Sequence, residues 1–214
     1  MLPTLINALR ETLYMVLYSS LFSIMIGIPL GMFLASIANS HTRVGRSMYS
    51  MSYGVLQIVK SVPYILVMLM FIPMTNWLIN HRVSFTSATI VPLTVAGSLL
   101  LAQTVYDIFA QLQVKWQSTL KAMGASKRQT LMLILLPESI GPIMVACANT
   151  SATIVGFSIV AGAFGAGGLG QFAIEKTITE PNFTYAVISI AALIAIQQLF
   201  KYTAILFIPQ KHLG

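Results

Sequence analysis

The segment Ser118-Thr-Leu-Lys-Ala-Met-Gly-Ala-Ser-Lys-Arg-Gln-Thr-Leu-Met-Leu-Ile-Leu-Leu-Pro137 is basic and separates two long apolar runs. At helical spacing its charged side chains share one face, while its leucine, methionine and isoleucine side chains share another. The glycine near its middle, Gly124, predicts two short helices joined by a turn. Two interpretations fit this pattern: a short helix that inserts into a groove of a partner outside the membrane, or an interfacial helix held by anionic lipid.

The composition outside this segment is that of a membrane protein. Charged residues make up 8% of the chain, against about 25% in soluble domains. Asp, Glu, Lys and Arg are absent from five blocks, each long enough for a helix that crosses the bilayer, which needs roughly 20 residues. We therefore predict an all-α membrane protein, a single domain over residues 1–214 with five transmembrane helices. The predicted spans are residues 12–38, 52–74, 86–110, 138–162 and 184–208.

Basic residues predict the orientation of the chain, because loops on the cytoplasmic side carry an excess of Lys and Arg. Residues 39–51 carry two arginines, and residues 111–137 carry three lysines and one arginine with no acid before Pro137. The opposite side has fewer basic residues, and glutamates accompany them. The expected arrangement has the N-terminus outside and the C-terminus in the cytoplasm. Because topology alone accounts for the segregated charge, we expect no nucleic-acid partner.

The predicted spans contain almost no ionisable residues, which are the usual mark of proton or ion coupling. Asp107 and Glu138 lie at the expected helix ends, where a solvated or capping carboxylate is common. The energy for any transport is therefore expected from outside this chain. We identify no catalytic residue and no metal site, and Cys147 has no second cysteine with which to pair.

The loop resembles the signature of ABC-importer permease subunits. That signature reads Glu-Ala-Ala, three residues, Gly, nine residues, then Ile-x-Leu-Pro, and it is matched here by Gly124, Ile134 and Leu136-Pro137. Residues 122–126, 135–138 and 164–171 look particularly similar to the methionine-importer permeases. The resemblance implies a type I ABC importer permease fold with a cytoplasmic coupling helix.

In that family the coupling helix docks on an ATP-hydrolysing subunit. The resemblance places this contact on Ser118, Thr119, Lys121, Ala122, Met123, Gly124, Ala125, Lys127 and Arg128. The chain departs from the motif at two positions: Ser118 replaces the Glu of the motif, and Thr119 replaces its first Ala. A salt bridge made by that Glu cannot form here, so docking must depend on shape and on the basic residues.

A glycine run follows the fourth predicted span. Its letters match a dinucleotide-binding fingerprint, but no strand precedes the run and no βαβ unit follows it. One interpretation is a flexible external turn. The other, implied by the resemblance, is an external gate that also meets a substrate-delivering protein. The gate residues would be Gly165, Gly167, Gly168 and Gly170.

The fourth span supplies the candidates for a translocation pathway. Asn149 and Thr153 share one helical face, and Ser151 and Ser158 share nearly the opposite face. One face is expected to line the path and the other to hydrogen-bond a neighbouring helix. In the first span, Gly27, Pro29 and Gly31 are expected to interrupt the helix, as packing kinks or as hinges.

The resemblance implies a multi-pass subunit of the bacterial inner membrane, working as a homodimer with two ATPase subunits and an extracytoplasmic binding protein. ATP and magnesium would be bound by the ATPase, and this chain would hold no cofactor. The implied cargo is methionine or a related small amino acid. Two alternatives stay open: a permease for another amino acid or a quaternary ammonium compound, and a channel or secondary carrier that works without a motor.

Overall fold

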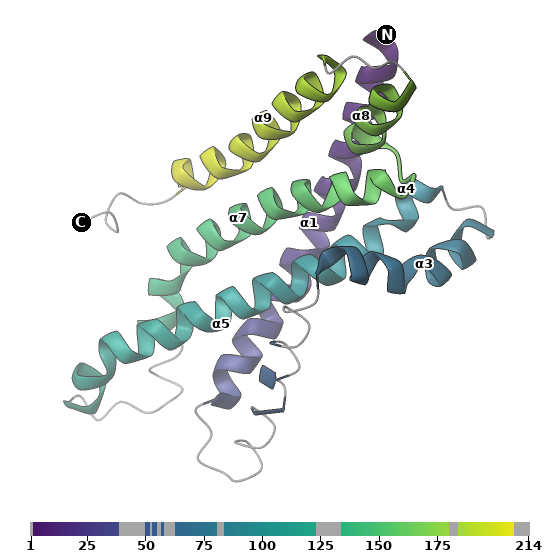
Figure 1. Ribbon diagram of the computed structural model, residues 1–214. Helices are drawn as coiled ribbons and strands as arrows, with labels where there is room; N and C mark the ends of the chain where they lie inside the picture. Colours follow the sequence, from purple (N-terminus) through teal and green to yellow (C-terminus); the bar gives the residue numbers. More distant parts are fainter. Residues whose placement is uncertain are drawn as a thin grey trace.

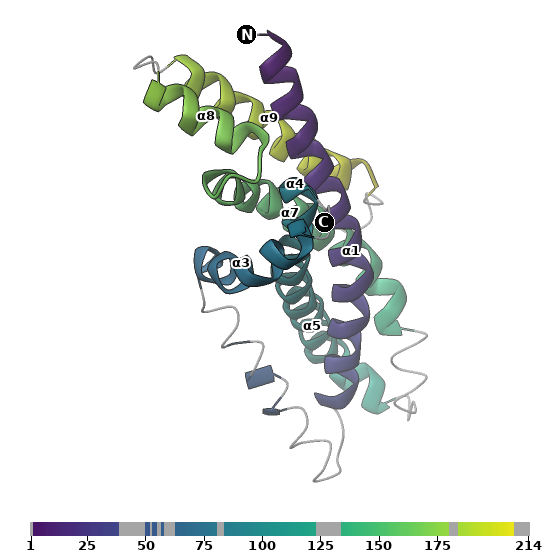
Figure 2. The ribbon, with the colours of Figure 1, turned by 90° about the vertical axis from the view of Figure 1, so that its right-hand side faces the viewer.

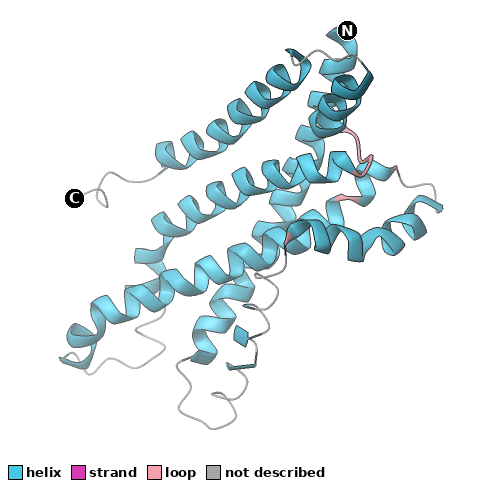
Figure 3. Cartoon of the chain, in the orientation of Figure 1, coloured by secondary structure: helices cyan, strands magenta, loops and turns pink. Residues whose placement is uncertain are grey.

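The computed structural model describes residues 2–38, 50–51, 53–54, 57, 63–80, 84–122, 134–179 and 184–207. The described part is helical, joined by short turns (Figures 1 and 3). Its helices are α1 (Leu2–Ala38), α3 (Tyr64–Asn80), α4 (Phe85–Ala88), α5 (Ile90–Ala122), α7 (Leu136–Ala163), α8 (Gly168–Thr179) and α9 (Thr184–Phe207). The predicted all-α class is confirmed.

Four stretches of the described chain are long and apolar enough to cross a membrane: Pro3–Ala38, Phe85–Trp116, Leu136–Ala163 and Thr184–Thr203. They correspond to the first, third, fourth and fifth predicted spans. The predicted second span overlaps α3, which has 17 residues and is shorter than the roughly 20 needed to cross the hydrocarbon core. Most of the residues before α3 lie outside the described part, so the count of five spans is not confirmed.

The predicted interruption of the first span is wrong. Helix α1 runs without a break through Pro29. Its two glycines instead allow close packing against α5, because a Cβ at Gly27 would lie 2.9 Å from the Ser98 carbonyl oxygen. A Cβ at Gly31 would lie 2.5 Å from the carbonyl oxygen of Ala102. The spacing of four residues puts both glycines on one face, as in close-packed membrane helix pairs.

Contacts of α1 with α5 are the most extensive in the fold, and α7 packs against both helices and against α9 (Figure 2). A first buried cluster joins α1, α3, α5, α7, α8 and α9 around residues such as Met15, Leu93 and Ile154. A second cluster joins α1, α5 and α7 around residues such as Val105 and Phe109. Both clusters centre on the α1, α5 and α7 helices, which therefore form the core of the bundle.

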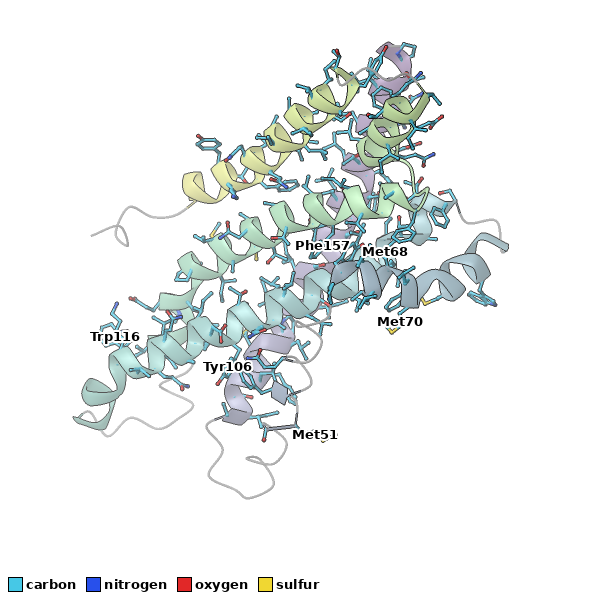
Figure 4. All side chains as sticks on the ribbon, viewed as in Figure 1. Met51, Met68, Met70, Tyr106, Trp116 and Phe157 are labelled. Carbon is cyan, nitrogen blue, oxygen red and sulfur yellow. The ribbon has the colours of Figure 1, made fainter. Side chains whose placement is uncertain are left out.

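Helix α3 crosses α7 beside the first cluster. The Tyr64 ring stacks on the Phe157 ring, with centroids 4.1 Å apart and an interplanar angle of 11°. Met68 is buried at the same crossing (Figure 4). These side chains anchor α3 to the bundle despite its short length.

The bundle has two distinct ends. The N-terminal part of α1, α4 and α8 lie together at one end, which we call the α8 end (Figure 1). The C-terminal part of α5 and the start of α7 lie at the other, which we call the loop end (Figure 1). The predicted coupling loop and the predicted external turn are thus at opposite ends of the bundle.

Candidate functional site

The predicted coupling loop begins as a helix. Helix α5 continues to Ala122, well beyond the expected end of the third span near residue 110. No glycine or proline occurs between Gly97 and Gly124, so nothing in the sequence stops the helix earlier. Ser118, Thr119, Lys121 and Ala122 lie in its last turns. The other predicted coupling residues, Met123, Gly124, Ala125, Lys127 and Arg128, are outside the described residues.

An ion pair joins the two helices on either side of this loop. Lys115 of α5 lies 3.5 Å from the Oε1 atom of Glu138, and the two side chains are 62% and 27% exposed. Glu138 is in the first turn of α7, where a carboxylate interacts favourably with the helix dipole. The nearby Trp116 marks the same end in Figure 4. An exposed pair contributes about 0–1 kcal/mol, so it positions the loop ends more than it stabilises the fold.

The glycine run forms a packed joint between α7 and α8. Gly165, Gly167 and Gly168 have φ values of 89°, 89° and 77°, a left-handed region that favours glycine. The Gly167 N–H donates to the Gln171 side-chain oxygen at 2.9 Å. Further along, a Cβ at Gly170 would lie 2.7 Å from the Ile159 carbonyl oxygen. The turn is therefore fixed by backbone geometry and by close packing.

Two side chains of α1 hold the start of α8. The Gly168 N–H donates to Glu11 Oε2 at 2.8 Å, and the Leu169 N–H donates to Thr12 Oγ1 at 2.8 Å. These N–H groups have no partner within α8, because the first N–H groups of any helix lack one. The Glu11 carboxylate also meets the positive end of the α8 dipole. Helix α1 is thus tied to a turn 157 residues later in the chain.

The four polar candidates of the fourth span divide between two faces of α7. Asn149 and Thr153 are exposed, and the Thr153 hydroxyl donates to the Asn149 carbonyl oxygen at 2.9 Å. Ser151 and Ser158 are buried, 4% and 2% exposed. Their hydroxyls donate to carbonyl oxygens of α7 itself, at 2.9 and 2.7 Å, and not to a neighbouring helix as expected. The exposed face is the one that offers polar groups to its surroundings.

Sequence reasoning missed three residues of the joint: Glu11, Thr12 and Gln171. The pairing of Glu11 and Thr12 with the glycine turn spans 157 residues, and no local pattern indicates it. One signal was present, since Glu11 immediately precedes the first long charge-free run, which makes it a carboxylate at a helix's membrane boundary.

The geometry describes a membrane bundle with a basic loop at one end and a braced glycine turn at the other, and it matches a known family of transport proteins. The sequence model of the binding-protein-dependent transport system inner membrane component matches residues 27–206. That range covers most of the chain. The chain belongs to this family of ABC transporter permease components, which are the non-catalytic membrane subunits of their transporters.

Within the family, the chain is similar to methionine permeases. It is 28% identical over 197 residues to the probable D-methionine transport system permease protein MetI of Vibrio cholerae, covering 92% of this chain and 87% of the relative. It is 31% identical to the corresponding probable protein of Pasteurella multocida, with 77% and 75% covered. The D-methionine permease of Escherichia coli K12 is 29% identical, with 74% and 72% covered.

Solved structures match the fold as well. An inward-facing structure of the MetNI methionine ABC transporter superposes with a TM-score of 0.81 at 28% identity, over 95% of this chain and 94% of that chain. A structure of an amino acid ABC transporter with histidines gives a TM-score of 0.72 at 18% identity, which speaks for the shared fold alone.

Proposed function

We propose that this chain is the permease subunit of an ATP-driven importer for methionine or a closely related small amino acid. The observation that carries the proposal is the structural match to the methionine transporter, a TM-score of 0.81 over nearly the whole of both chains. The similarity to methionine permeases from several bacteria supports the same cargo. In this proposal the chain performs no chemistry and works by changing shape.

The proposed motor is a pair of ATPase subunits that bind the loop end. ATP and magnesium are held by these subunits, and the last turns of α5 with the residues up to Arg128 form the contact. Helical continuity supports this role, because α5 runs from the membrane span into the docking segment. A displacement of the docking segment is then carried along one stiff helix into the core. The ion pair between Lys115 and Glu138 couples the start of α7 to the same displacement.

The proposed path lies between two copies of the chain, along the exposed face of α7. Asn149 lies in the middle of a span and is exposed in the single chain. An amide without a hydrogen-bond partner in lipid costs several kcal/mol, about 4–8 on a hydrocarbon scale, so this face is expected to meet water or a second copy. Asn149 and Thr153 line the path in this proposal, with Ser151 and Ser158 on the side of the helix behind them.

The proposed outer gate is the glycine turn, Gly165 to Gly170, with Glu11 and Thr12 as its brace. This assignment gives the N-terminus of α1 to the outside and the loop end to the cytoplasm, as the distribution of basic residues favours. The binding protein would deliver cargo at the α8 end. Closure of the ATPase pair would then turn the path from inward-open to outward-open.

The test is transport in liposomes with purified parts. We expect methionine uptake only when the chain, its genomically adjacent ATPase, the binding protein and ATP are all present. Uptake by the chain alone would refute the proposal and favour a motor-free carrier. Uptake of another solute, with methionine inert in a ligand screen of the binding protein, would refute only the cargo.

The docking segment has its own test with a matched control. Gly124→Trp places a bulky side chain in the segment that meets the motor, and it should abolish co-purification with the ATPase. Ile178→Trp places the same side chain on α8, where the native residue is 77% exposed, and it should leave the complex intact. Retention of the ATPase by Gly124→Trp would overturn the assignment of this loop.

A further inference from the structure

An open surface pocket of about 450 Å³, lined by residues with polar side chains, lies at the α8 end between α1 and α4. Its volume is within the range of small-molecule sites, about 300–1,000 Å³. Among the described residues that line it are one cation and one carboxylate, together with hydroxyl and amide groups. Its lining residues are Asn7, Arg10, Glu11, Tyr14, Ser84, Thr86 and Ser87.

Both the cation and the carboxylate of this pocket have hydrogen-bonding groups without a partner in the part of the chain that the structure describes. Among the described residues, Arg10 makes no ion pair or hydrogen bond. Glu11 uses Oε2 to accept from Gly168, which leaves Oε1 available to a ligand. The Ser84 and Ser87 hydroxyls bond each other at 2.9 Å, and one hydroxyl hydrogen of the pair remains to donate. A ligand with an anionic and a cationic group would satisfy both charges.

The pocket is at the level where two membrane spans leave the hydrocarbon. On α1, residues 12–40 carry no charge, so Arg10 and Glu11 are the first charges beyond the span. On the other wall, the candidate span that contains α4 and α5 begins at Phe85, next to Ser84. Two independent elements thus place the pocket among lipid headgroups, in whichever leaflet this end lies.

The surface below the pocket is suited to a lipid chain. Tyr14 and Tyr18 pair with ring centroids 4.7 Å apart, and tyrosines gather at the membrane interface. On the same exposed stripe, one and two turns from Tyr14, Leu17 and Leu21 are 53% and 54% exposed. An acyl chain attached to a headgroup in the pocket would lie along this stripe. A free amino acid would satisfy the charges but make no contact with this stripe.

We propose that this pocket binds the headgroup of a zwitterionic aminophospholipid of the phosphatidylethanolamine type. Arg10 and the serine hydroxyl bind the phosphate, for which guanidinium geometry is well matched. The primary ammonium donates to Glu11 Oε1 and lies near the Tyr14 ring, a contact that favours cations. A headgroup with net negative charge would meet the Glu11 carboxylate in the same pocket and is disfavoured. Because Glu11 also braces the glycine turn, a bound headgroup touches the α1–α8 joint directly.

Native mass spectrometry of the purified chain tests this proposal without the ATPase, so its outcome is independent of the proposed function. Phosphatidylethanolamine, phosphatidylcholine and phosphatidylglycerol with the same acyl chains are titrated separately. We expect the first to be retained at least about five-fold better than the other two, because only its ammonium can donate hydrogen bonds. Equal retention of ethanolamine and choline lipids, or a preference for the glycerol lipid, would overturn the proposal.

Two variants locate the site. Arg10→Ala should reduce retention of phosphatidylethanolamine about five- to ten-fold, through loss of a charge-assisted contact. The matched control Lys176→Ala removes another cation at the same end, on α8, and should leave retention unchanged. An equal loss in both variants, or no loss in Arg10→Ala, would sink the assignment. So would displacement of the lipid by free methionine, which would make the pocket an amino acid site.

Discussion

Replacing Gly31 with alanine tests whether the α1–α5 contact depends on the absence of a side chain. The added Cβ would lie 2.5 Å from the Ala102 carbonyl oxygen and 2.7 Å from Val105 Cβ. The first neighbour is backbone, so the two helices must move apart to admit the methyl group. Overpacking of this kind costs about 1–3 kcal/mol. Alanine also favours the helix by about 1 kcal/mol over glycine, which partly masks the loss.

Gly156→Ala is the control that removes this masking. It makes the same change within another membrane helix, but the nearest atom to its Cβ, Gln197 Nε2, is 3.8 Å away, an ordinary contact. The difference between the two variants isolates the overpacking, about 1–3 kcal/mol, or a Tm gap of roughly 2–12 °C for a chain of this size. The single half-buried Cys147 allows unfolding to be followed with a thiol-reactive dye. Equal melting of the two variants would refute the packing argument.

Three further predictions concern the two ends of the bundle. Gly168→Ala should destabilise the turn by at least about 1–2 kcal/mol, the cost of a left-handed residue with a Cβ, and should speed amide exchange at Leu169; unchanged exchange would contradict it. Glu11→Gln keeps an oxygen acceptor and should cost less than Glu11→Ala, for which we expect about 1–2 kcal/mol in thermal unfolding; the reverse order would show that the carboxylate does not cap α8. Lys115→Glu and Glu138→Lys should each cost at most about 1 kcal/mol, and the double reversal should recover the loss in a double-mutant cycle; simple additivity would show that the two residues do not interact.

The parts of the fold that followed from sequence are those with a local cause. Charge-free blocks identified four helices long enough to span, because a buried charge in lipid is too costly to occur by chance. Helical spacing separated Asn149 from Ser151 and Ser158, and the structure has the first exposed and the other two buried. The family resemblance read from the coupling loop is confirmed by the match over residues 27–206.

The parts that did not follow depend on distant partners. Gly27 and Gly31 were expected to break the helix. Their effect on its stability changes sign when another helix packs closely enough to fill the space that a side chain would occupy. The predicted end of the second span at residue 74 was too early, because α3 continues to Asn80, and most of the residues before α3 lie outside the described part. The extension of α5 into the coupling loop was missed because its polar residues were taken as the end of the helix.

The bond between Glu11 and Gly168 also has a consequence for biosynthesis. A ribosome adds roughly 5–20 residues per second, so the 157 residues between the partners take roughly 8 to 30 seconds to make. During that interval α1 has already been synthesised, but Glu11 cannot accept its hydrogen bond because Gly168 has not yet been added to the chain. The nascent chain therefore completes this corner of its architecture among the last, only after the start of α8 has been synthesised.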